Sequence, residues 1–357
     1  MFRAKLFSLA KVGLPCLCLV LVLASCGTGS GAVATVPPRV PQPEWMSNLS
    51  GFMSARPTYM IAVGSGNSRQ VAEMDALRQL VMTFGTDVQV DTRLVESYRE
   101  VIRSGVVASW GDTALDRTIV LGAGMDNLIG AEISDFWTDG RGNHHALAVM
   151  NKARAIQVYS EMLRANLEII ANLTDMSVAE RNTIAGFSRY QFAAVVADMS
   201  VSYGVVLSVL GAPHHAQGLR RGDDFRRQAQ EIVRTIPIGI NVRNDRAGRI
   251  QNAFAGAFSE FGFRTGGTNP RYLLDVNVVV HPTDHAGANV FARMELTANL
   301  IDTQTLSVLL PYGFNLREGH RTQLEAENRA FLVAEQRIAG EYRNMLSNHL
   351  FQLVPRR

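Results

Sequence analysis

Cysteine is scarce in this chain of 357 residues, and the little that is present lies at one end. The three cysteines are Cys16, Cys18 and Cys26, so none follows residue 26. A disulfide framework and a cysteine metal site are therefore excluded from the body of the chain. Lysine is almost as rare, since arginine supplies nearly all of the basic side chains.

Net charge is also nearly absent once the N-terminus is set aside. The chain carries +3 at neutral pH, and Arg3, Lys5 and Lys11 lie in the first 25 residues, which contain no acidic residue. The remaining chain is therefore neutral and has no long-range field to attract nucleic acid or an anionic surface. Hydrophobic residues make up 47% and charged residues 19%, a composition that excludes disordered, collagen-like and polytopic membrane proteins.

The first 26 residues have the pattern of a lipoprotein leader. The basic residues above precede an uncharged, mostly apolar run at 12–24, which suits a signal peptide and is short for a membrane span. Residues 23–26, Leu-Ala-Ser-Cys, resemble the bacterial lipobox, in which the cysteine thiol receives a diacylglycerol. We therefore predict a signal peptide at 1–25 and lipidation of Cys26. An uncleaved anchor and an ordinary secretory cleavage are the alternatives.

The residues after Cys26 indicate where the lipid anchor would be held. Gly27 follows the cysteine, whereas an aspartate there would favour the inner membrane. We expect a bacterial outer-membrane lipoprotein that faces the periplasm, with surface exposure as the alternative. Residues 26–43 are rich in Gly, Ser and Pro and are predicted to be a tether. Its reach is at most roughly 50 Å, at about 3 Å per residue.

Residues 44–165 are predicted to form a small α+β domain. A strand at 59–63 is expected to turn at 64–66 into a helix ending near residue 83, and 88–92 alternate like another strand. Segments 129–137 and 145–150 flank a hairpin turn at 139–143, and a helix opens at Asn151. The predicted buried face of the first helix consists of Val71, Met74, Leu77, Leu80 and Val81.

Residues 166–235 read as a helical middle segment. Ser177 and Glu180 have the spacing of a capping box, and apolar residues recur at helical spacing from Phe192 to Leu210. That stretch could be a transmembrane span. Asp198 and several serines favour a buried helix instead, with Asp198 on a solvated face.

Residues 236–357 are predicted to form a second α+β domain. A strand at 236–242 and a helix at 245–261 precede three strands at 272–280, 291–301 and 306–314, with turns at 282–288 and 302–304. A long helix at 322–350 closes the chain. The fold class is therefore α+β, with two small α/β-sandwich-like units, antiparallel sheets and a helical segment between them.

Several features of residues 44–163 resemble one bacterial family. They are, in order, Pro43-Glu44-Trp45 after a tether, the run 61–66, the spaced Ala72 and Ala76, and the hairpin end 146–150 before Asn151-Lys152-Ala153. This order resembles the twenty-kilodalton surface-lipoprotein family (Lpp-twenty). The resemblance implies a protein of outer-membrane structure or flagellar outer rings and carries no catalytic residues. Residues 236–350 resemble, more faintly, the amino-terminal domain of TolB-type and penicillin-binding-protein-activator lipoproteins.

Three sequence features could form an anion or metal site, but each also fits an ordinary turn, loop or strand. Gly64-Ser65-Gly66 before a helix could hold an anion, but it lacks the Gly-Lys-Ser/Thr end of a P-loop and favours a tight turn. His281 and His285 flank Asp284 in a predicted loop, where solvated histidines are favoured over a metal site. The adjacent pairs are His144-His145, in a strand whose neighbours face opposite ways, and His214-His215, in a predicted loop.

The sequence evidence for catalytic residues is also weak. No Gly-x-Ser-x-Gly motif is present. The possible carboxylate pairs are Asp135 with Asp139 and Asp223 with Asp224, each in a predicted turn. The basic group is Arg220, Arg221, Arg226 and Arg227, which alternates with acids and favours a solvated helix start over a nucleic-acid site.

We therefore expect a non-enzymatic structural or protein-binding lipoprotein with no cofactor and no metal. Its expected partners are the membrane, through the lipid on Cys26, and other envelope proteins or a second copy of the chain, but not nucleic acid. One alternative is a regulator that activates a cell-wall synthase or flagellar and envelope assembly. The other is an enzyme whose site is not recognisable from its motifs.

Overall fold

Residues 41–84, 130–283 and 289–354 are described by the structure, a computed structural model. They belong, from Gln42 onward, to one unit of the chain. The predicted signal peptide, Cys26, the tether up to residue 40 and the strand at 88–92 lie outside the described residues.

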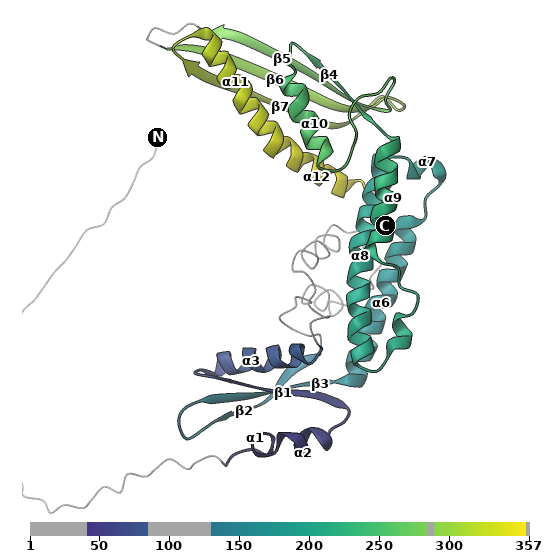
Figure 1. The fold of residues 1–357 in the computed structure, drawn as a ribbon, viewed down its shortest axis with the longest axis vertical. Coiled ribbons are helices and arrows are strands. Elements are labelled where there is room, and N and C mark those ends of the chain that lie inside the picture. Colours follow the sequence, from purple (N-terminus) through teal and green to yellow (C-terminus); the bar gives the residue numbers. More distant parts are fainter. Residues whose placement is uncertain (1–40, 85–129, 284–288, 355–357) are drawn as a thin grey trace, which may run out of the picture. The chain divides into compact units, whose positions relative to one another are not determined.

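The first sheet has three strands in the order β1-β3-β2. Strands β1 (Tyr59–Gly66) and β2 (Ala131–Thr138) both pair antiparallel with the central β3 (His144–Asn151). Helix α3 (Arg69–Met82) covers one face, and the short helices α1 (Glu44–Ser47) and α2 (Leu49–Ser54) lie on the other (Figure 1). On the α1 side, Trp45 packs with Ile61, Leu147 and Val149 in a small buried cluster.

The buried face of α3 agrees with the predicted one only in part. Ala72, Ala76 and Leu80 are fully buried, whereas Val71 is 45% and Met74 56% exposed. The reason is the close approach of the helix to β1: a Cβ atom on Gly64 would lie 2.0 Å from the backbone nitrogen of Ala76. Only small side chains fit where the helix and strand approach most closely, and Val71 and Met74 face outward. Leu80 is buried as predicted, and Leu77 and Val81 pack against the core.

The middle of the chain is helical, as predicted. Helices α6 (Lys152–Thr174) and α9 (Gly222–Thr235) pack on opposite sides of α8 (Ile184–Val209), as Figure 1 shows. The capping box is confirmed in α7 (Val178–Arg181), because Ser177 and Glu180 exchange side chain-to-backbone hydrogen bonds. Among the described residues α8 is the one helix whose length and apolar composition would suit a membrane span, but most of it is buried against its neighbours.

Asp198 on α8 has a different environment from the solvated face that the sequence predicts. Its carboxylate accepts a hydrogen bond of 2.8 Å from the backbone nitrogen of Gly222 and one from the Arg226 guanidinium. The side chain is 26% exposed. A Cβ atom on Gly222 would lie 2.4 Å from this carboxylate, so glycine permits the contact. Asp198 therefore joins α8 to the first turn of α9.

The second sheet has four strands in the order β4-β5-β6-β7. Strands β5 (Tyr272–Thr283), β6 (Val290–Asp302) and β7 (Ser307–His320) form the predicted antiparallel meander. The expectation of purely antiparallel sheets is wrong for β4 (Ile238–Arg243), which pairs parallel with β5. Helix α10 (Arg249–Ser259) forms the crossover between them, and a crossover of this kind returns the chain in the same direction.

The closing helix covers the same face of this sheet as α10 (Figure 1). It begins after Thr322, whose hydroxyl accepts a hydrogen bond from the nitrogen of Glu325, and it runs through three segments. These are α11 (Gln323–Arg337), the π-helical turn η4 (Ile338–Tyr342) and α12 (Arg343–Gln352). The α+β class predicted from the sequence is therefore confirmed.

Candidate functional site

The segment Gly64-Ser65-Gly66 forms the end of strand β1 and is not the predicted turn. The backbone nitrogen of Ser65 donates a hydrogen bond of 3.0 Å to the carboxylate of Asp75 on α3. A carboxylate therefore already occupies the amide that an anion would need. Asp75 was missed from the sequence, because its contact depends on how α3 lies on the sheet.

Ser65, His145 and Asp139 form a row that resembles a catalytic triad. The Ser65 hydroxyl lies 2.8 Å from Nδ1 of His145, and Nε2 of His145 lies 3.8 Å from Oδ2 of Asp139. The first contact follows from the register, which places Ser65 directly opposite His145. The second is too long for a hydrogen bond. The row therefore lacks the second hydrogen bond of a catalytic triad.

The carboxylate of Asp139 is already used to order the β2–β3 turn. It accepts hydrogen bonds from the backbone nitrogen of Arg141 at 2.8 Å and from both nitrogens of Asn143 at 2.9 Å. The side-chain hydrogen bond from Asn143 is the largest cause that lowers the pKa of Asp139 to about 2. Asp139 is therefore a structural carboxylate of the predicted hairpin turn.

The other histidines occupy separate places. His144 lies 3.1 Å from the Thr138 hydroxyl and stacks on Phe136, whereas His145 stacks on Trp137 on the other face, as expected of strand neighbours. His214 and His215 lie in the short 3-10 helix η3 (Pro213–Ala216).

His281 lies within β5 opposite Arg293, because this strand continues beyond its predicted end. Asp284 and His285 lie outside the described residues. Within residues 41–84, 130–283 and 289–354 no group of three or more His, Cys, Asp or Glu side chains could hold a metal.

The candidate carboxylate pairs also have structural partners. Asp135 accepts a hydrogen bond of 2.7 Å from the Trp45 indole. It therefore supports the position of Trp45 and does not form a carboxylate pair with Asp139. Asp223 and Asp224 lie in the first turn of α9, where they pair with Arg226 and Arg227. These mixed charges form the solvated helix start that the sequence predicts.

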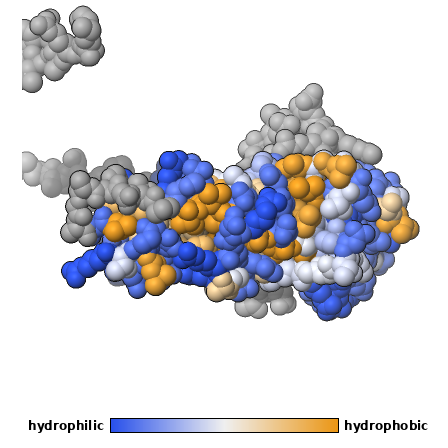
Figure 2. Space-filling view, turned by 90° about the horizontal axis from the view of Figure 1, so that it is seen from above, coloured by the Kyte–Doolittle hydropathy of each residue, from blue (hydrophilic) through white to orange (hydrophobic). Residues whose placement is uncertain are grey.

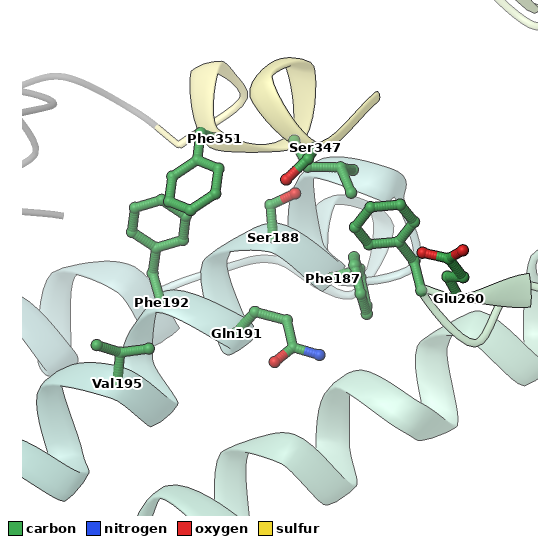
Figure 3. A pocket seen from close by; sticks show the side chains of 10 residues that line it. Phe187, Ser188, Gln191, Phe192, Val195, Glu260, Ser347 and Phe351 are labelled. Carbon is green, nitrogen blue, oxygen red and sulfur yellow. The ribbon is translucent and has the colours of Figure 1, made fainter. Parts of the chain in front are cut away.

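A pocket of about 330 Å³ lies where α8 meets the end of α10 and α12 (Figure 3). Its walls are mainly apolar, and the rings of Phe192 and Phe351 meet edge to face with centroids 5.0 Å apart. Its polar members are Ser188, Gln191, Glu260 and Ser347. This pocket was not predicted from the sequence, because its three walls come from segments about 70 and 90 residues apart along the chain.

The first sheet and its helices are similar to a known protein family. Residues 43–151 match the model of the LPP20 lipoprotein family. This confirms the resemblance predicted for residues 44–163 and supports a bacterial lipoprotein. The LPP20 region covers α1, α2, α3 and all three strands of the first sheet, whereas the helical middle and the second sheet lie beyond it. The fainter TolB-like resemblance of residues 236–350 is not supported.

Three solved structures illustrate the structural likenesses. A secreted protein from Helicobacter pylori is 12% identical, with 78% of this chain and 97% of that chain covered and a TM-score of 0.38. A minor lipoprotein from Acinetobacter baumannii is 12% identical, covering 32% and 92% with a TM-score of 0.24. The PelC dodecamer from Paraburkholderia phytofirmans is 18% identical, covering 34% and 88% with a TM-score of 0.22. No function is inferred from likenesses this distant. No curated protein sequence matches the chain.

Proposed function

We propose that the chain is an outer-membrane lipoprotein, anchored through lipid on Cys26 and facing the periplasm, that binds other envelope proteins and catalyses no reaction. The observation that carries this proposal is the match of residues 43–151 to a lipoprotein family, after a lipobox and a segment rich in Gly, Ser and Pro. Lipid on the cysteine would hold the chain at the membrane, because each buried methylene contributes about 0.8 kcal/mol.

Open sheet edges support binding through protein contacts. In the described part of the chain, β2 ends the first sheet on one side and β7 ends the second, so each pairs with only one neighbour. An edge strand presents unpaired backbone groups on its outer side, and an extended segment of another protein can add to it. The same geometry permits a second copy of the chain to bind.

The Ser-His-Asp row and the carboxylate pairs favour a non-enzymatic role. The candidate carboxylates already have structural partners: Asp139 orders a turn, Asp135 binds the Trp45 indole, and Asp223 and Asp224 form ion pairs in the first turn of α9. The surface seen in Figure 2 is mixed, with separate hydrophobic patches among hydrophilic residues, which suits several contact areas.

The anchor is tested by the variant Cys26→Ser in the native host. The variant should take up no radiolabelled palmitate and should accumulate as an unprocessed precursor, because serine lacks the thiol that receives the lipid. The native chain should be found in the outer-membrane fraction and should crosslink to specific envelope proteins in cells. Palmitate incorporation into the variant, or an inner-membrane location of the native chain, would contradict the proposal.

A further inference from the structure

The outer edge of β7 presents a defined row of backbone groups. Among the described strands, β7 pairs with β6 alone. The nitrogen of Thr303 donates a hydrogen bond of 2.7 Å to the carbonyl of Arg271, which continues the β5–β6 ladder by one pair. Odd-numbered residues of β6 therefore face β5, and even-numbered ones face β7. The register then directs the backbone groups of residues 311, 313, 315, 317 and 319 away from the sheet.

Pro311 marks one end of this row. Proline has no N–H, and inside a strand it is tolerated where its nitrogen faces away from the ladder, which agrees with the direction derived above. The register irregularity opposite Leu300 and Ile301 lies just before Pro311 in β7. The part of the edge that another strand can pair with regularly is therefore Pro311 to Gly319.

The side chains along this row leave the edge uncovered. Pro311, Gly313, Asn315 and Arg317 are exposed. A charged side chain often protects an edge strand from pairing. The guanidinium of Arg317 lies instead over the ring of Phe291 on β6, 4.1 Å from its centroid, and so is directed away from the edge.

A second, antiparallel copy of β7 matches the row. In a pair centred on Asn315, the two Asn315 residues lie opposite each other, and Gly313 lies opposite Arg317 of the second copy. Opposite residues that face each other in this way exchange both backbone hydrogen bonds. Glycine leaves room for the arginine, and the two side-chain amides are complementary as donor and acceptor. A pair centred on Arg317 would place two like charges opposite each other.

The same register accommodates the N–H that Pro311 lacks. It places Pro311 opposite Gly319 of the second copy, whose N–H can donate to the Pro311 carbonyl. The carbonyl of Gly319 would receive nothing from proline, but it already accepts a hydrogen bond of 3.3 Å from the Arg329 guanidinium. The one missing donor of the edge therefore meets the one acceptor that has a partner inside its own chain.

Helix α11 is compatible with this pairing. It packs over both β6 and β7 (Figure 1). In the pair, the two copies of α11 would lie on the same face of the joined sheet, roughly two strand spacings or about 10 Å apart. That is a usual distance between packed helices.

We propose that two copies of the chain pair through β7, antiparallel and centred on Asn315, and join their four-stranded sheets into one. The proposal rests on the proposed function only in treating β7 as an edge that binds protein. It names the partner, a second copy, and the register of the contact.

The test of the register uses the purified full-length chain in detergent, with a single cysteine introduced. No cysteine follows Cys26, and the native chain gives the background of the oxidation. Asn315→Cys should form a disulfide-linked dimer on mild oxidation, because Cα atoms of such opposite residues are about 5.5 Å apart. Arg317→Cys, on the same strand and face, should form at least about tenfold less, since its Cα atoms would be roughly 14 Å apart.

Thr297→Cys controls for random collision. Residue 297 is exposed on the same face of the sheet as residue 315, but it lies one strand further in, on β6. This variant should form no more dimer than the native chain does, because the two introduced thiols would be separated by both copies of β7.

A second pair of variants tests the backbone hydrogen bonds. Asn315→Pro removes an outward N–H and leaves the β6 ladder intact, as Pro311 does, and should raise the dissociation constant of the dimer at least about tenfold. Asn315→Ala keeps the N–H and should remain a dimer. Light scattering at several protein concentrations measures both. If Asn315→Pro does not fold by circular dichroism, the comparison of Asn315→Cys with Arg317→Cys decides.

The proposal is overturned if the native chain is monomeric at every concentration, or if Arg317→Cys or Thr297→Cys crosslinks as well as Asn315→Cys does. It is also overturned if a folded Asn315→Pro dimerises as strongly as Asn315→Ala. Outer-membrane fractionation and crosslinking to other envelope proteins do not depend on this pairing. A monomeric chain would therefore leave the proposed function standing, and a dimer of the purified chain would be found even if the outer-membrane location were wrong.

Discussion

The indole nitrogen of Trp45 donates a hydrogen bond of 2.7 Å to the carboxylate of Asp135, 90 residues further along the chain. The contact depends on an irregularity in β2, where the register shifts between Ile133 and Asp135. Ile133 lies opposite Ala148, which belongs to the core under α3, whereas Asp135 lies opposite Leu147, which faces Trp45. The extra residue turns Asp135 to the other face of the sheet.

Removing this carboxylate should loosen α1 from the sheet. We expect Asp135→Ala to lower the free energy of unfolding by about 1 kcal/mol, because the buried Trp45 loses a charge-assisted hydrogen bond at a partly exposed site. The measurement is denaturant unfolding followed by tryptophan fluorescence. Asp135→Asn keeps an acceptor and should cost less. Equal stability of Asp135→Ala and the native chain would refute the contact.

Gly64 should be indispensable for the packing of α3. In Gly64→Ala the new methyl group would meet the backbone nitrogen of Ala76 at 2.0 Å, and backbone cannot move as a side chain can. We expect a loss of about 3 kcal/mol or more in the free energy of unfolding. The matched control is Gly256→Ala on α10, where an added Cβ meets nothing within 4 Å.

The control should be neutral or should gain up to about 1 kcal/mol, since alanine is the better helix former. Both variants can be compared by denaturant unfolding of the same preparation. A Gly64→Ala variant as stable as Gly256→Ala would mean that α3 does not approach β1 so closely.

Asp139 should make stability depend on pH in the acid range. Hydrogen bonds from Asn143 lower the pKa of its carboxyl to about 2, from an ordinary value of 3.8. A carboxyl with a lowered pKa contributes stability above pH 3.8, and this contribution is lost as the pH falls toward 2. Asp139→Asn should therefore show a weaker fall in unfolding free energy between these two pH values. The comparison is a series of urea titrations, and parallel curves for the two proteins would contradict the assignment.

The hydroxyl of Tyr342 is buried without a hydrogen-bond partner among the described residues. Its ring packs against Phe254, with ring centroids 4.8 Å apart, and burial raises the pKa of Tyr342. Tyr342→Phe should therefore raise the free energy of unfolding by about 1 kcal/mol, since an unsatisfied polar group leaves the core.

Tyr272 supplies the control for the same substitution. Its hydroxyl accepts a buried hydrogen bond of 3.3 Å from the backbone nitrogen of Ile184. Tyr272→Phe should lower the free energy of unfolding by about 1 kcal/mol, because that nitrogen loses its acceptor. Thermal unfolding of both variants measures the difference. A change in unfolding free energy in the same direction for both would contradict the conclusion that the Tyr342 hydroxyl is unpaired and the Tyr272 hydroxyl is paired.

Much of the secondary structure was predictable because its signals are local. The capping box at Ser177, the hairpin turn at Asp139 and the periodicity of α8 each depend on residues within a few positions of one another. Hydrophobicity predicted Leu80 on the buried face of α3 but not Ala72 and Ala76, which fit there because of their small size. Similarly, the contact of Asp198 with Arg226 could not be predicted, because the two residues are 28 positions apart in the chain.

The sequence by itself determined the α+β class, the order of most elements and the likeness of residues 43–151 to a lipoprotein family. Tertiary structure alone decided the parallel pairing of β4, the face on which Asp135 lies and the pocket around Gln191. The physical reason is the range of the interactions. Turns, caps and periodicity act between neighbours in the chain, whereas strand register, close helix approach and pocket walls depend on surfaces that meet only after folding.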